Sequence, residues 1–147
     1  MDQENAPPVP VVNASLLLSA FGYWPTFHDG EVHRALLDRG VSGEPPSVTL
    51  VIHAFDTDNT VDEKGYYRVT TSLLVTLRFD DVRESELRDL GSQNVLSSLE
   101  FELDPSGLVR VTLGPLLWPV RLAAMRRGDR HLGSTVAVTD GRCPACP

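Results

Sequence analysis

Four ionisable side chains fall within six residues of the chain, at His28, Asp29, Glu31 and His33. On an extended backbone Asp29, Glu31 and His33 share one face, and imidazole with carboxylate can ligate a divalent metal or serve acid–base chemistry. Metal sites built from one strand alone are unusual, however. We therefore favour structural roles, in which Asp29 accepts backbone N–H groups in a turn and His28 packs on a neighbouring aromatic ring.

His28, Asp29 and Glu31 belong to a stretch that we call the connector, residues 21–32, which holds four aromatic residues, two glycines and a proline. The connector is predicted to join a short helix to the first strand. Exposed aromatic side chains beside charged ones are typical of binding surfaces, so Tyr23 and Trp24 are candidate partner-binding residues. If Tyr23, Trp24 and Phe27 are fully buried, the connector instead anchors the fold.

A second polar group, residues 56–65, is predicted to form an acidic loop. Its carboxylates are further candidate partner-binding residues: Asp56, Asp58, Asp62 and Glu63. The first 104 residues hold 7 Lys/Arg and 18 Asp/Glu, a net charge of −11, whereas residues 105–147 hold 6 Arg and 2 Asp, a net charge of +4. An acidic surface disfavours nucleic acid as the partner and suits a basic protein. Acidic loops also keep a domain soluble, which is the simpler interpretation of charge alone.

Two smaller motifs complete the polar residues of interest. Gln93 and Asn94 precede a predicted strand, where side-chain amides either cap a turn or hydrogen-bond a partner. Cys143 and Cys146 have CxxC spacing, but one such pair supplies only two of four zinc ligands, and a single residue follows Cys146. Residues 141–147 are therefore predicted to be a flexible tail. The chain has neither a P-loop nor a dinucleotide fingerprint, and no cofactor is predicted.

The length of 147 residues fits one domain, predicted over residues 13–140 after a proline-rich, flexible leader at residues 1–12. Asn13 and Gly22 are suited to cap a helix over Ala14–Ala20. No apolar run approaches the roughly 20 residues that cross a bilayer, and no secretory signal is visible. We therefore expect a cytoplasmic protein without a membrane partner.

After the connector the hydrophobic pattern has a period of two, which is typical of strands. The predicted strands are Glu31–Leu37, Ser47–Phe55, Tyr66–Phe79, Val95–Leu103, Leu108–Leu113, Leu116–Ala123 and Ser134–Thr139. Within Tyr66–Phe79, one face is predicted to be buried and carries Tyr67, Val69, Leu73, Val75, Leu77 and Phe79. The predicted fold class is α+β, with a twisted antiparallel sheet of about six strands and one or two short helices. A β-sandwich is the alternative.

Four motifs, taken together, resemble the immunity protein 50 family of small bacterial proteins. They are Phe21-Gly22-Tyr23-Trp24-Pro25-Thr26-Phe27-His28-Asp29-Gly30-Glu31-Val32, Val61-Asp62-Glu63-Lys64-Gly65-Tyr66-Tyr67, Leu77-Arg78-Phe79, and Gln93-Asn94-Val95-Leu96 followed by Leu99. The resemblance implies a protein that protects its bacterium by binding a cognate toxin, and it supplies no catalytic residues. The arginine-rich segment after Gly114 is unlike the family.

Three functions follow from these observations. The favoured one is a non-enzymatic immunity protein that neutralises a cognate protein toxin by steric and electrostatic blockade. The alternatives are a small metal-dependent hydrolase that uses His28, Asp29, Glu31 and His33, and a non-catalytic scaffold protein. The sequence does not fix the oligomeric state.

Overall fold

The structure is a computed structural model of the whole chain. It describes residues 5–9, 11–86, 91–103, 105, 108–115, 120–126 and 135–139, and for residues 108, 115, 120–126 and 135–139 only the backbone. The predicted tail with Cys143 and Cys146 lies outside these residues.

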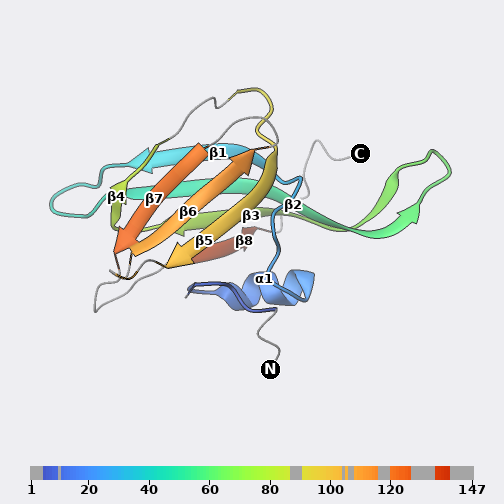
Figure 1. Cartoon of the computed structure of the whole chain (residues 1–147), viewed down its shortest axis with the longest axis horizontal. Helices are drawn as coiled ribbons and strands as arrows, with labels where there is room; N and C mark the ends of the chain where they lie inside the picture. The colour runs from blue at the N-terminus through green and yellow to red at the C-terminus, as the bar shows by residue number, and fades with distance from the viewer. Residues whose placement is uncertain are drawn as a thin grey trace.

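One short helix and eight strands make up the described chain (Figure 1). They are α1 (Ala14–Phe21), β1 (Glu31–Asp38), β2 (Ser47–Val61), β3 (Tyr67–Phe79), β4 (Val82–Glu84), β5 (Leu96–Leu103), β6 (Leu108–Pro115), β7 (Val120–Arg126) and β8 (Thr135–Thr139). All strand pairs are antiparallel, in two sheets with the orders β1-β2-β3-β8 and β4-β7-β6-β5.

The prediction of antiparallel strands with a short helix is confirmed, but that of one sheet is wrong. A period of two shows that a residue run is a strand, and it does not show which strands pair. Here β5, β6 and β7 pair with one another and with the short β4, so they form a second layer (Figure 1). This arrangement has the two layers of the predicted alternative, a sandwich.

The core lies between the two sheets. Alternate residues of β2 and β3 face it from one sheet, and β5 and β6 contribute from the other. The buried side chains of these four strands are Val48, Leu50, Ile52, Ala54, Val75, Leu77, Phe79, Leu96, Leu99, Val111 and Leu113. Each of these side chains except Ala54 contributes roughly 1.5–3 kcal/mol by leaving water. The strand β2 is central in its sheet, with β1 and β3 as neighbours.

The helix α1 packs beside β8 and buries Leu17 completely. Asn13 precedes it in a left-handed conformation and makes no side-chain cap bond, while Gly22 ends it with φ of 80° and an N–H that donates to Leu18 O at 2.8 Å. Part of the predicted leader contacts the body, because Val9 is buried and Asn5 O accepts the Trp24 N–H. The division into leader, domain and tail stays a prediction.

The hairpin of β2 and β3 extends beyond the second sheet as a long projection (Figure 1). We call residues 58–70 the arm, because every residue in this range is exposed. The predicted acidic loop is thus wrong for residues 56–61, which belong to β2, and the true turn is residues 62–66. The predicted buried face of β3 is also wrong at Tyr67 and Val69, which lie in the arm beyond the reach of the second sheet.

Among the helices that the structure describes, none has the length and apolar character needed to cross a membrane.

Candidate functional site

Two aromatic side chains of the connector, Phe27 and Trp24, turn toward the core. Phe27 is only 3% exposed, and the half-buried Trp24 packs its ring edge-on against Phe27 and Phe101, with centroid separations of 6.2 and 6.0 Å. Such aromatic pairs add roughly 0.5–1.5 kcal/mol beyond the area they bury. Trp24, predicted as a partner-binding residue, therefore packs against the core.

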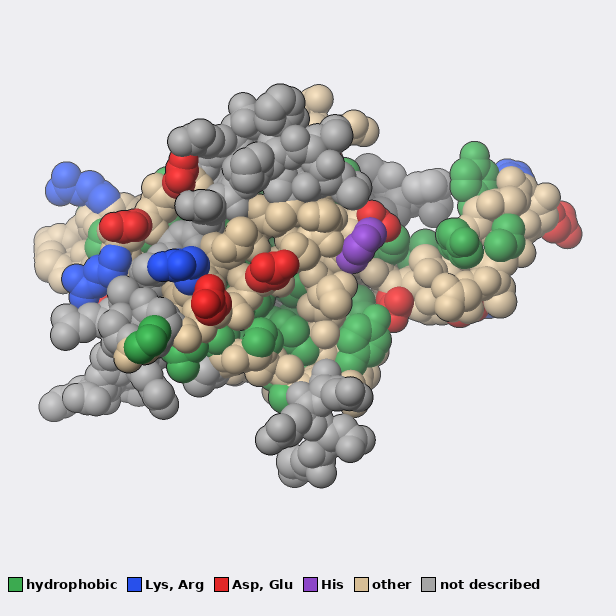
Figure 2. Space-filling view, viewed as in Figure 1, with side chains coloured by type: hydrophobic (Ala, Val, Ile, Leu, Met, Phe, Trp, Pro, Cys, Tyr) green, Lys and Arg blue, Asp and Glu red, His purple; other side chains and the backbone are tan. Residues whose placement is uncertain are grey.

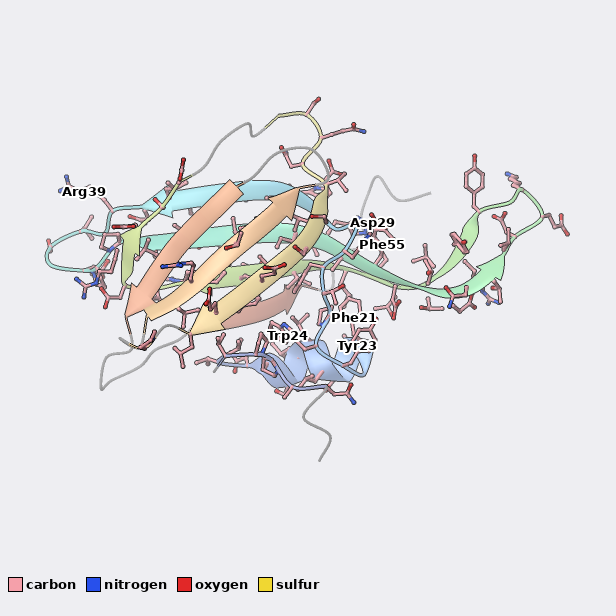
Figure 3. All side chains as sticks on the ribbon, in the orientation of Figure 1. Phe21, Tyr23, Trp24, Asp29, Arg39 and Phe55 are labelled. Carbon is pink, nitrogen blue, oxygen red and sulfur yellow. The ribbon has the colours of Figure 1, made fainter. Side chains whose placement is uncertain are left out.

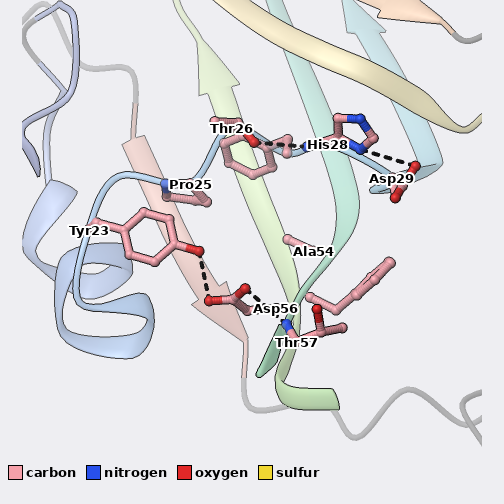
Figure 4. A pocket seen from close by; sticks show the side chains of 10 residues that line it. Tyr23, Pro25, Thr26, His28, Asp29, Ala54, Asp56 and Thr57 are labelled. Atoms are coloured by element: carbon pink, nitrogen blue, oxygen red, sulfur yellow. Dashed lines mark hydrogen bonds and ion pairs between the residues drawn. The ribbon is translucent and has the colours of Figure 1, made fainter. Parts of the chain in front are cut away.

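Tyr23 lies at the surface, where it joins the connector to the root of the arm. Its hydroxyl donates to Asp56 Oδ2 at 2.7 Å, and this bond, with partial burial and the carboxylate charge, raises the pKa of Tyr23 to about 12 (Figure 4). Asp56 Oδ1 also accepts the N–H of Thr57. The structure thus brings together Tyr23 and Asp56, two of the predicted partner-binding residues from distant parts of the sequence.

A pocket of roughly 170 Å³ opens beside this pair. It is lined by Tyr23, Pro25, Thr26, Phe27, His28, Asp29, Ala54, Phe55, Asp56 and Thr57 (Figure 4). Asp29 and Phe55 mark its position at the root of the arm in Figure 3. It is smaller than the 300–1,000 Å³ of typical small-molecule sites, so the geometry does not favour a substrate pocket.

The predicted ionisable cluster divides into two separate pairs. His28 Nδ1 lies 3.1 Å from Asp29 Oδ1 with both side chains largely exposed, and His33 Nε2 lies 4.0 Å from Glu31 Oε2. Asp29 has φ of 62°, which breaks the extended course that would have aligned it with Glu31 and His33. Among the described residues, no three His, Cys, Asp or Glu side chains gather closely enough to hold a metal ion. His28 was expected to pack on an aromatic ring, but it is not among the ring contacts of the described residues.

His33 does face a histidine that the sequence analysis did not consider. Its ring lies 6.0 Å from that of His53, whose Nε2 is 2.7 Å from Ser72 Oγ. Burial and the nearby His33 lower the pKa of His53, against the smaller opposite effect of Glu31. A mostly neutral imidazole that is tied to a hydroxyl is consistent with a structural role on β2.

The three remaining carboxylates of the predicted binding set lie in the arm, and two of them shape it. Asp58 Oδ1 accepts the side-chain hydroxyl and the N–H of Thr60, and these bonds lower the pKa of Asp58. Asp62 Oδ1 accepts the N–H groups of Lys64 and Tyr66 at 2.8 and 2.9 Å and so closes the turn. Glu63 is exposed within that turn.

The sequence analysis missed the apolar side chains that accompany these acids. Tyr66 and Tyr67 are 69% and 65% exposed, and Val61 and Val69 are more than half exposed. Tyr67 lies opposite Val61, and Val69 is two residues along the same strand, so these three side chains share one face of the arm. Figure 2 shows hydrophobic side chains along the arm with acidic ones near its end. The sequence contained one signal of this exposure. The segment of β2 opposite this part of β3, residues 56–61, is polar at nearly every position and offers no apolar cover.

Asn94 has a clear structural role. Its side chain accepts the Gly91 N–H at 2.7 Å and donates to Gly91 O and Val32 O, while its own carbonyl accepts the Val32 N–H. It therefore ties the turn before β5 to the start of β1. Gln93, its neighbour in the predicted motif, is exposed.

Comparison with known proteins places this geometry in a family. The model of the family described as immunity protein 50 matches residues 13–113, which is 101 of the 147 residues. The chain belongs to the immunity protein 50 family. The predicted resemblance is thus confirmed, and the matched region of this immunity protein 50 member contains the connector, the arm and Asn94. Searches of curated proteins and of solved structures gave no match.

Proposed function

We propose that this member of the immunity protein 50 family binds a cognate bacterial toxin in the cytoplasm and neutralises it by steric and electrostatic blockade. The family assignment supports a binding protein. The observation that carries the rest is the arm, where two exposed tyrosines stand among carboxylates on a two-stranded projection. A narrow projection can enter a cleft that a flat surface cannot.

Both components of the arm suit tight and rapid binding. Tyrosine is enriched at binding hot spots because its ring buries a large area while its hydroxyl still finds a hydrogen bond. The carboxylates of Asp58, Asp62 and Glu63 would steer a basic partner during encounter and would contribute mainly to the association rate. Tyr23 and Asp56 extend this surface to the body, whereas Trp24 supports it from inside.

The pairs formed by His28 with Asp29 and by Glu31 with His33 do not favour the hydrolase alternative. Their side chains do not converge on a common point among the described residues, and the neighbouring pocket is small. We therefore propose no catalytic residue in this part of the protein.

The proposal is tested by capturing a partner with the tagged full chain and expressing that partner alone and together with the chain. We expect the partner to stop growth when expressed alone and growth to return on co-expression. A partner without toxicity would support the scaffold alternative instead.

The contribution of the arm is tested with the double substitution Tyr66→Ser and Tyr67→Ser. Loss of two hot-spot side chains should weaken binding of the captured toxin by about 30-fold or more. The matched control is Leu103→Ser, an exposed apolar side chain of β5 on the body, which should bind normally. Equal affinity of the double variant and the wild type would place the binding surface elsewhere.

A further inference from the structure

The edge strand β1 carries exposed apolar side chains along its outer edge. Among the described strands of its sheet β1 pairs with β2 alone, and its first residues are covered on the other side, where Val32 N–H donates to Asn94 O at 3.0 Å. Beyond the bulge at His33, the described residues provide no second neighbour for residues 34–38. Leu36 and Leu37 in this segment are 55% and 53% exposed. Exposed apolar residues on a sheet edge invite pairing with another strand.

The backbone of this segment has hydrogen-bonding groups that point away from β2. Hydrogen-bonded and non-hydrogen-bonded pairs alternate along an antiparallel ladder. Because Val32 donates to Asn94, its pairing with Ile52 is of the non-hydrogen-bonded kind. The alternation continues across the bulge, so the N–H and C=O groups of Ala35 and Leu37 also point away from β2.

The side chains of the same segment are self-complementary. If Leu36 lies opposite Leu36 of a second, antiparallel copy, then Ala35 lies opposite Leu37, and their outward backbone groups form hydrogen-bonded pairs on both sides of the two-fold axis. The same register sets Arg34 opposite Asp38 twice. Arg34, Leu36 and Asp38 share one face of β1, because they pair with Val51, Thr49 and Ser47 of β2.

Neither charged side chain of this face, Arg34 or Asp38, forms an ion pair within the described part of the chain. Its salt bridges include neither Arg34 nor Asp38. Asp38 uses Oδ1 to accept the Gly40 N–H at 2.8 Å, so Oδ2 can accept from an arginine of another molecule. Within one strand the two residues are four positions apart, about 13 Å, which is too far for them to pair with each other.

We propose that the protein forms a two-fold dimer by antiparallel pairing of residues 34–38 of β1 with the same residues of a second copy. The inference is independent of the proposed toxin binding. The start of β1 lies beside the part of β2 that continues into the arm, whereas Arg39 follows β1 at the opposite end (Figure 3). Antiparallel pairing therefore points the two arms in opposite directions, and each dimer presents two separate arms.

The test is the mass of the full chain by sedimentation velocity and light scattering across a concentration series. The wild type should reach the mass of two chains. Leu36→Lys should weaken the dimer by at least about 100-fold, because it puts two ammonium groups opposite each other at the axis. The matched control is Leu103→Lys, an exposed leucine at the end of β5, an edge strand of the other sheet, and it should dimerise normally.

A charge swap tests the register. Arg34→Asp and Asp38→Arg should each weaken the dimer by about tenfold or more, and the double variant should regain most of the wild-type affinity, since it restores both opposed pairs. Circular dichroism and thermal unfolding confirm that each variant is folded, which matters for Asp38→Arg because it loses the bond to Gly40. Arg34→Asp leaves that bond intact.

Three results would overturn the proposal. The wild type could remain monomeric at every concentration. The double swap could fail to recover, which would mean another register or another surface. Finally, the wild type could be a monomer whose captured partner is no longer bound by the Leu36→Lys variant. A strand of that partner, not a second copy, would then occupy the edge.

Discussion

The connector and the arm both combine aromatic with charged residues, and the fold treats them in opposite ways. In the connector Phe27 is buried and Trp24 packs between two rings, although both belong to a segment with no strand periodicity. In the arm Tyr67 and Val69 are exposed, although they belong to the clearest alternating pattern in the chain. Composition therefore does not decide exposure. What decides it is whether another layer covers the segment.

The largest effect expected from this comparison is on stability. Phe27→Ala should lower the free energy of unfolding by about 3–5 kcal/mol, because it leaves a cavity beneath Trp24. Tyr67→Ala, which removes a ring of similar size from the arm, should change it by less than about 0.5 kcal/mol. Urea denaturation of both variants measures the contrast. A similar decrease in the free energy of unfolding for both variants would mean that the arm is covered in solution.

An intermediate effect is expected within the arm. Asp62→Ala removes the acceptor of two turn amides and should raise local opening by about 1 kcal/mol, seen as faster hydrogen exchange at Lys64 and Tyr66. Asp62→Asn keeps an oxygen at the same place and should preserve most of the protection. Because Asp62→Asn removes the charge while it keeps the turn, slower toxin capture by this variant would separate steering from structure. Equal exchange in all three proteins would deny Asp62 its role in the turn.

The smallest effect concerns the bond that joins the two segments. The pKa of Tyr23 is raised from 10.0 to about 12 in the folded state, so the folded protein holds this proton more tightly than the unfolded chain. The stabilisation is therefore complete below pH 10 and is lost as the pH rises to about 12. It should be under about 1 kcal/mol, because the pair is partly solvent-exposed.

Tyr23→Phe provides the control for this pH dependence. The stability difference between wild type and variant should be constant up to about pH 9.5 and should vanish near pH 12, as measured by urea denaturation at each pH. A difference that does not change with pH would mean that Tyr23 contributes through packing and not through its bond to Asp56.

Much of the secondary structure was predictable from local signals. The alternation of apolar residues located the strands, and Gly22 marked the end of α1 as expected. Two of the errors share one cause, because the period of a strand gives its two faces without saying what lies against either. The single predicted sheet and the buried Tyr67 failed for this reason, whereas the acidic loop over residues 56–61 failed because polar residues also form strands where both faces are exposed.

The candidate site was predictable only in part. The acidic residues were found because charge is visible in the sequence, and the family motifs identified the immunity protein 50 family. The pairing of Tyr23 with Asp56 across 33 residues could not be read from either segment alone. The exposed side chains of Val61, Tyr66 and Val69 were missed because an apolar residue in a strand is normally a core residue.

The sequence by itself determined the strands, the helix end at Gly22, the acidic first two thirds and the family. These depend on residue types and short spacings, which act locally along the chain. Only the tertiary structure decided that the hairpin of β2 and β3 outgrows the second sheet, that Trp24 packs against the core, and that no described strand pairs with the outer edge of β1 beyond His33. Those features depend on which strands pair and where one layer ends over another, and such long-range contacts leave no periodic signal in the sequence.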